Sequence, residues 1–256
     1  MTDRMLLNAI DTGPPIDTGA PINTATPNRT ALLLHGLMGS AESWWRVIPL
    51  LERRGYRVIA LDLPGHGLSP RDPDLTIERA AASVVETVRH RVAGHAEIHA
   101  IGHSYGATVL AAASGRLRPA TAVHVDAIPR ITGGQDRRAL TERYEQDRRN
   151  RTDPDWLRAT RPYYSATDAA VEARAAERFD PATSASLSAG AGGEWPMRPG
   201  SILILPDPSG RVADADARNA ARGGVDVRTV PGAAHTVWYS HFEEFTASVP
   251  EMFGTR

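Results

Sequence analysis

The sequence predicts an α/β fold in which a mostly parallel central sheet carries helices on both faces. Short apolar runs alternate with longer amphipathic segments along most of the 256 residues, and this alternation is typical of such a fold. Right-handed crossovers and short connections then leave few alternative topologies.

The elements follow one another in a regular order. The segment 6–23 is less regular and could add one or two antiparallel edge strands. A helix over 40–54 has Ser40 as its expected N-cap, and Gly55 lies just past its end. The last predicted helix covers 241–253. The remaining predicted strands are 31–34, 56–61, 98–101, 122–125, 202–205 and 225–230, and the remaining predicted helices are 76–91, 105–116 and 212–222.

One stretch interrupts this order. Residues 127–198 contain no convincing strand; 132–150 and 168–179 are predicted to be helical, and 184–193 to be a loop. We therefore predict an α/β core formed by 1–126 and 199–256, with a helical cap inserted between two of its strands. The insertion is rich in aromatic residues, and its 12 Arg against 11 acidic residues are interpreted as a solvated helix surface.

Composition excludes several classes of function. The chain is 41% hydrophobic and 23% charged, and no apolar run approaches the length of a membrane span. The polar N-terminus lacks the apolar core of a signal peptide, so we expect a cytoplasmic protein. A net charge of −1 implies no attraction to nucleic acid or anionic membranes. The oligomeric state is not indicated.

Cysteine and lysine are both absent from the sequence. Disulfides, thiolate metal sites and cysteine nucleophiles are thereby excluded, as are lysine Schiff bases and phosphate-loop lysines. No pair of histidines has metal-ligand spacing on one helix; His95 and His99 are four apart, but they fall in or beside a strand. We predict neither a metal nor a cofactor, and a small molecule as the substrate.

A candidate nucleophile lies at Gly102-His103-Ser104-Tyr105-Gly106, which fits the pattern G-x-S-x-G. The pattern alone is weak, since chance gives roughly 0.1 matches in a chain of this composition. Its position strengthens it, because it begins where an apolar strand ends and opens a helix. Such a turn presents the Ser104 hydroxyl at the carboxyl edge of the sheet, where open α/β folds bind their ligands.

A serine nucleophile needs a base and donors for the oxyanion. His235 follows the last predicted strand, so its loop can reach the same sheet edge as Ser104; His241, at the start of the last helix, is the nearest rival. The backbone N–H of Tyr105, which follows the nucleophile, is one expected donor. The second comes from the glycine-rich loop after the first core strand, with Leu37 ahead of Met38.

Together these motifs resemble the α/β-hydrolase family, in particular its capped, esterase-like branch. The matching pieces are His35-Gly36 with Gly39, the elbow at Ser104 and the loop from Gly232 to His235. The fourth piece, Asp62-Leu63-Pro64-Gly65-His66-Gly67-Leu68-Ser69, is highly specific for these proteins. The resemblance covers most of 30–125 and 200–250. It implies that Asp62 and His66 brace loops and are not catalytic.

The acid of the triad departs from this resemblance. Most family members carry it a few residues beyond the strand that follows the cap, where this chain has Ser209 or Gly210. Asp207 comes about two residues early. The alternative is the end of the preceding strand, where Asp126 follows directly; the acid needs to be close to the histidine but needs no fixed place in the chain. We favour Asp126 over Asp207.

The resemblance implies a serine hydrolase that cleaves a carboxylic ester, lactone or amide through Ser104, His235 and Asp126. The aromatic insertion suggests a small, moderately apolar substrate, with His35, Trp156 and Tyr163 as candidate contacts. Two other functions stay open. One is a cofactor-free dioxygenase that cleaves a heteroaromatic ring, since those enzymes resemble this chain in the position of the acid. The other is a non-catalytic ligand-binding protein on the same fold.

Overall fold

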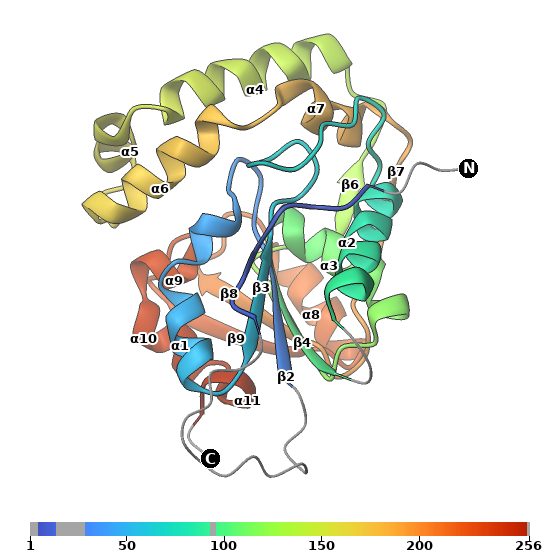
Figure 1. Ribbon diagram of the computed structural model, residues 1–256, viewed down its shortest axis with the longest axis vertical. Helices are drawn as coiled ribbons and strands as arrows, with labels where there is room; N and C mark the ends of the chain where they lie inside the picture. Colours follow the sequence, from blue (N-terminus) through green and yellow to red (C-terminus); the bar gives the residue numbers. More distant parts are fainter. Residues whose placement is uncertain (1–4, 14–28, 93–95, 255–256) are drawn as a thin grey trace.

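Seven strands form the central sheet in the computed structural model, which describes residues 5–13, 29–92 and 96–254 (Figure 1). Every neighbouring pair is parallel except the pair of β1 with β3, which is antiparallel. The predicted mostly parallel sheet is therefore confirmed, and β1 is an antiparallel edge strand. Residues 14–23 of the irregular N-terminal segment, and His95, lie outside the described residues. In spatial order the strands are β1 (Ala9–Asp11), β3 (Arg57–Leu61), β2 (Arg29–Leu34), β4 (Glu97–His103), β5 (Thr121–Val125), β8 (Ile202–Asp207) and β9 (Asp226–Pro231).

Helices cover both faces of the sheet because alternate strand residues are apolar on both sides. In β2, Leu32 and Leu34 pack with α2 (Ile77–Arg91) and α3 (Tyr105–Leu117). Ala31 and Leu33 point to the other face, against α1 (Val47–Arg53) and the C-terminal helices. The five inner strands of the sheet are largely buried, whereas the edge strands β1 and β9 are partly exposed. The inner strands therefore hold the loops at their carboxyl ends in fixed positions.

Two predicted helices are divided in the structure. Ser40 caps a short 3-10 helix, η1 (Ala41–Trp44), and α1 (Val47–Arg53) follows it as a separate helix, whereas one helix was expected over 40–54. The helix expected over 241–253 consists of α10 (Phe242–Ala247) and α11 (Pro250–Phe253), preceded by the unpredicted α9 (Val237–Ser240). Pro250 explains the second break, since proline lacks the N–H that a continuous helix would need there.

The remaining helix of the core, α8 (Asp214–Arg222), begins two residues later than expected. It packs on Leu203 and Leu205, which alternate along β8 with Ile202 and Ile204 of the opposite face. None of the helices in the described part of the chain is long and apolar enough to cross a membrane.

The insertion between β5 and β8 contains four helices beside one end of the sheet (Figure 1). They are α4 (Arg137–Arg151), α5 (Pro154–Thr160), α6 (Ala166–Glu177) and α7 (Pro181–Ala189). The expected absence of strands is wrong, because β6 (Arg130–Thr132) pairs antiparallel with β7 (Gly192–Glu194). That this insertion acts as a cap stays a prediction.

The helix α7 corrects the loop expected over 184–193. Asp180 caps it through Thr183, and Pro181 occupies its first turn. Its buried residues include Thr183, Ser184 and Ser186, whose hydroxyls do not produce the apolar periodicity by which a helix is detected. Ser186 instead donates to the carbonyl of Leu75 at 2.9 Å, which fixes this helix to the core.

Candidate active site

Ser104 lies in the turn between β4 and α3, with φ 51° and ψ −117°. Positive φ is strained for a residue with a Cβ and is held here by its surroundings. The Ser104 N–H donates to the carbonyl of Val125 at 2.9 Å. A Cβ at Gly102 would collide with the backbone of Gly106, and a Cβ at Gly106 with the backbone of Leu34. The two glycines therefore allow the close packing that presents the Ser104 hydroxyl.

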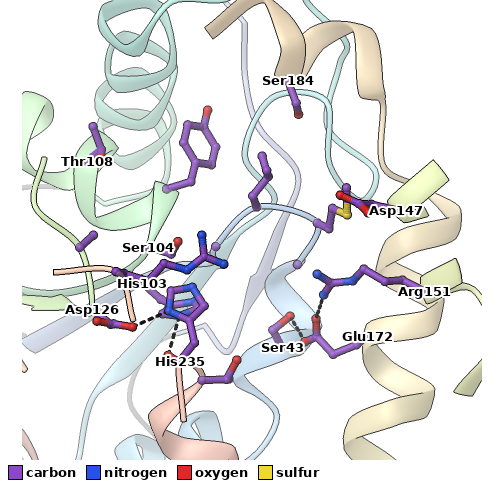
Figure 2. Close-up of a pocket in the computed structure, with 18 of the residues that line it drawn as sticks. Ser43, His103, Ser104, Thr108, Asp126, Asp147, Arg151, Glu172, Ser184 and His235 are labelled. Carbon is purple, nitrogen blue, oxygen red and sulfur yellow. Dashed lines mark hydrogen bonds and ion pairs between the residues drawn. The ribbon is translucent and has the colours of Figure 1, made fainter. Parts of the chain in front are cut away.

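His235 contacts the carboxylate of Asp126, with 2.6 Å between His235 Nδ1 and Asp126 Oδ2. Asp126 follows β5 directly, has a positive φ of 46° and is only 2% exposed. With its Nδ1–H donated to this carboxylate, the imidazole keeps Nε2 as a proton acceptor. Ser104 and His235 line the same cavity (Figure 2).

Asp207 does not take part in this contact. It is exposed at the end of β8, and its carboxylate has no hydrogen-bond partner among the described residues. Only its backbone approaches the histidine loop, where its carbonyl accepts from the N–H of Gly232 at 2.9 Å. The structure thus brings Asp126, and not Asp207, to His235. The rival base His241 lies at the junction of α9 and α10, outside the cavity lining.

Ser209 was not predicted to contribute, although it stands where the resemblance places the acid. Its hydroxyl donates to Asp126 Oδ1 at 2.7 Å. The Oγ of Ser209 itself accepts from the N–H groups of Val212 at 2.9 Å and Arg211 at 3.1 Å. These two bonds orient the hydroxyl, so that both oxygens of Asp126 are held by named partners.

His103, the residue before Ser104, supports the loop that carries His235. Its Nε2–H donates to the carbonyl of His235 at 3.0 Å, and its ring packs edge-on against Trp238 at 4.9 Å. Burial, together with the charge on His235, holds the pKa of His103 well below its usual value. His103 is therefore neutral, and one of its nitrogens is always a donor.

The two expected oxyanion donors lie at the cavity wall. Leu37 and Tyr105 both line the cavity, and neither backbone N–H has an acceptor among the residues that the structure describes. Backbone N–H groups left without a protein acceptor are available to a ligand oxygen. Met38, the second choice, lines the cavity as well.

His35 was predicted to contact the substrate, and the structure corrects this prediction. It is fully buried and does not belong to the cavity lining. Its Nε2 accepts from the N–H of Leu63 at 2.9 Å, and its Nδ1–H donates to the carbonyl of Gly36 at 2.7 Å. Both nitrogens are thus used within the protein, so His35 braces the loop that carries Leu37.

Asp62 has the bracing position that the resemblance implies. Its carboxylate accepts from the N–H groups of Ala41 at 2.7 Å and Leu68 at 2.9 Å, and from the amide of Asn8 at 2.7 Å. His66 is buried nearby, and burial lowers its pKa to about 3. Neither side chain lines the cavity.

The cavity has a volume of about 770 Å³ and lies between the sheet edge and the insertion. Trp156 and Tyr163, two of the candidate substrate contacts, line it, but its wall is more polar than the expected moderately apolar pocket. Four aromatic residues of the insertion line the cavity, but arginines, acidic residues and hydroxyl groups line it beside them. The four are Tyr144, Trp156, Tyr163 and Tyr164. The number of aromatic residues in the insertion therefore did not predict how polar the cavity wall is.

Glu172 of α6 lies across the cavity from Ser104 (Figure 2). Its Oε1 accepts from the hydroxyls of Ser43 at 2.7 Å and Tyr239 at 3.0 Å, and its Oε2 from Arg151 at 3.1 Å. Burial and the charge of Glu172 raise the pKa of Tyr239 well above its usual value, so Tyr239 stays a donor. This network closes the wall opposite the nucleophile.

Sequence reasoning missed the arginines of this wall. Arg143, Arg151 and Arg161 line the cavity, although the arginines of the insertion were interpreted as a solvated surface. Each lies on or just after a helix that also carries exposed arginines. No local pattern distinguishes the two groups, because only the packing of α4, α5 and α6 decides which arginines face inward.

Comparison with known proteins identifies a family whose model matches most of the chain. A model of the alpha/beta hydrolase family matches residues 31–248. Esterase PIR7B of Oryza sativa subsp. japonica is 33% identical over 100 residues, which are 38% of this chain and 37% of that protein. Methylesterase 8 of Arabidopsis thaliana is 36% identical over 84 residues, 32% of this chain and 30% of that protein. The chain thus matches less than half the length of these relatives.

Solved structures share the fold over nearly the whole chain. A marine microorganism esterase superposes with a TM-score of 0.69 at 16% identity, covering 97% of this chain and 99% of that one. A bromoperoxidase from Bacillus anthracis gives 0.73 at 16% identity, covering 97% and 95%. At this level of identity the likeness concerns the fold alone.

Proposed function

Because the chain belongs to the alpha/beta hydrolase family, we propose that it is a serine hydrolase that cleaves a carboxylic ester, or a related lactone or amide, of a small molecule. The observation that carries the proposal is the 2.6 Å contact between His235 Nδ1 and Asp126 Oδ2 at the wall of a cavity that Ser104 also lines. A nucleophile, a base and an acid in this relation are the parts that acyl transfer requires.

In the proposed reaction the Ser104 hydroxyl attacks the carbonyl carbon while His235 Nε2 takes the hydroxyl proton. Asp126 holds the imidazole in the required tautomer and stabilises the imidazolium that forms. The N–H groups of Leu37 and Tyr105 bind the oxyanion. His235 then gives the proton to the departing alcohol or amine. A water that His235 deprotonates attacks the acyl-enzyme and releases the acid and the free Ser104.

A fluorophosphonate probe tests the nucleophile. It should label the folded protein at neutral pH, and Ser104→Ala should lose both the label and the hydrolysis of p-nitrophenyl acetate, by a factor on the order of 10⁶. Ser184→Ala is the matched control, because this buried hydroxyl also lines the cavity but has no hydrogen-bond partner among the described residues. Labelling that persists in Ser104→Ala, or no labelling of the wild type, would contradict the proposal.

The position of Asp126 after β5 also favours a second candidate, the cofactor-free dioxygenase. There His235 would deprotonate a ring hydroxyl, and the resulting anion would react with oxygen. Oxygen uptake with a hydroxyquinolone-type substrate, without ester hydrolysis, would favour this function over the first. Turnover of esters that depends on Ser104 would set aside both the dioxygenase and a purely ligand-binding protein.

A further inference from the structure

The cavity wall is more positive than the chain as a whole. Five arginines line it against three acidic residues, whereas the net charge of the chain is −1. Two of the three acids, Asp126 and Glu172, are already bonded to His235 and Arg151 respectively. The arginines are Arg130, Arg143, Arg151, Arg161 and Arg211.

Three of these arginines have no carboxylate partner among the residues that the structure describes. Arg130 pairs with Asp216 and Arg151 with Glu172. In the part of the chain that the structure describes, Arg143, Arg161 and Arg211 form no ion pair with an acidic side chain. A guanidinium that faces a cavity without a protein anion is suited to an anion brought by the ligand.

Aromatic rings pack against the guanidinium groups of two of these three arginines. The guanidinium of Arg143 lies over Tyr144, 5.2 Å from the ring centroid. That of Arg161 lies 5.6 Å from Trp156 and 5.9 Å from Tyr164. Stacking engages the face of a guanidinium and leaves its N–H groups available in the plane. The aromatic residues of the insertion thus support cationic side chains more than they form an apolar pocket.

Arg211 belongs to the same loop as the support of Asp126. Its backbone N–H donates to the Ser209 hydroxyl, which in turn donates to Asp126. Its charge also reaches His103, where it is one of the smaller causes, after burial and His235, of the lowered pKa. The His103 ring lies 4.5 Å from that of His235. Arg211 is therefore the unpaired arginine that the structure ties to the catalytic residues.

We propose that the substrate is a small ester or amide that also carries a carboxylate, and that Arg211 binds this carboxylate beside the reacting carbonyl. Arg143 and Arg161 raise the positive potential of the facing wall and draw the anionic substrate into the cavity. This inference rests on the proposed hydrolase function and names its substrate class. It changes no step of the hydrolysis, in which water adds across the ester or amide bond.

Matched substrates test the charge preference. Monoethyl esters of dicarboxylic acids, from malonate to adipate, should be compared with the ethyl esters of the corresponding monoamides, which have nearly the same shape and no charge. We expect kcat/KM at low salt to favour the acid by about tenfold or more, the effect of a hydrogen bond to a charged group. The preference should shrink as ionic strength rises.

The Arg211→Gln variant should lower the acid-to-amide ratio of kcat/KM about tenfold, back towards one. Arg89→Gln is the matched control, because Arg89 is exposed on α2 and lies outside the cavity lining; its ratio should equal that of the wild type. A ratio near one in the wild type, or an unchanged ratio in Arg211→Gln, would overturn the inference while leaving Ser104-dependent hydrolysis intact.

A binding measurement separates this inference from the proposed function. Calorimetric titration of Ser104→Ala with glutarate should give binding that Arg211→Gln abolishes, whether or not any ester is turned over. Arg211-dependent binding without Ser104-dependent turnover would contradict the hydrolase and support the anion site. Inorganic phosphate binding as tightly as glutarate would overturn the assignment to a carboxylate.

Discussion

The two walls of the cavity are built differently. The wall that carries Ser104 is made of backbone held in unusual conformations, with positive φ at Met38, Ser104 and Asp126, and of short side chains that bond one another. The facing wall is made of long side chains from α4, α5 and α6, such as Arg151 and Arg161. In the proposed enzyme the first wall determines where the bond is broken, and the second helps to determine which molecule is accepted.

Because of this difference, the residues of the first wall are easier to predict from a sequence than those of the second. A strained turn needs glycines at fixed distances from the functional residue, and those glycines are a pattern. A long side chain can reach a cavity from many positions on a helix, so it leaves no fixed spacing. If the two walls divide their tasks in this way, substitutions beside Ser104 should lower kcat most, and substitutions on the facing wall should mainly change the substrate preference.

The largest effect after loss of Ser104 is expected at Asp126. Asp126→Asn should lower kcat for p-nitrophenyl acetate by about 10³-fold or more, because an amide cannot hold the imidazole in the productive tautomer. Asp207→Asn is the matched control and should cost less than about tenfold, since its carboxylate has no partner among the described residues. The reverse ranking would overturn the choice of acid.

A smaller effect is expected at Ser209, a positioning residue that acts through Asp126. Ser209→Ala should lower kcat about tenfold with little change in KM, because one hydrogen bond to a carboxylate is lost. Ser209→Thr keeps the hydroxyl and should restore most of kcat. Equal rates in all three proteins, at equal melting temperatures, would show that Asp126 needs no such support.

The smallest effect is expected on the facing wall. Trp156→Ala removes the ring beneath Arg161, so it should change the preference between p-nitrophenyl acetate and bulkier esters by about threefold, the scale of one cation–π contact. Stability should change little, since Trp156 is only partly buried. Trp195→Ala is the control, from the insertion but outside the cavity lining.

Equal loss of activity toward small and bulky esters, with a collapsed melting temperature, would instead make Trp156 a core residue. The facing wall would then contribute to the stability of the fold as well as to the choice of substrate.

The sequence predicted most of the sheet because buried strands are continuous apolar runs, as in β2 and β8. It failed at α7, where serine and threonine hydroxyls bonded inside the protein resemble a loop. It also failed at the break before Pro250, although proline lacks the N–H that a continuous helix would need at that position.

The residues of the candidate site divide in the same way. Ser104 and His235 follow from motifs, whereas the preference for Asp126 over Asp207 depended on the resemblance, which offers the end of the preceding strand as an alternative place for the acid. His35 was misplaced, because its position at a strand end does not say which side of the loop it faces. Ser209 and Arg211 were not predicted, since the contact of Ser209 with Asp126 and the place of Arg211 at the cavity appear only in three dimensions.

The bond between Ser209 and Asp126 has a consequence for how such a site can evolve. The two positions that an acid occupies on this fold, after β5 and after β8, lie within one hydrogen bond of each other, at 2.7 Å between Ser209 Oγ and Asp126 Oδ1. A carboxylate could therefore move from one strand to its neighbour by two substitutions, without displacing the histidine it serves. For the proposed reaction, what matters is that a carboxylate lies beside His235, and the strand that carries this carboxylate matters less.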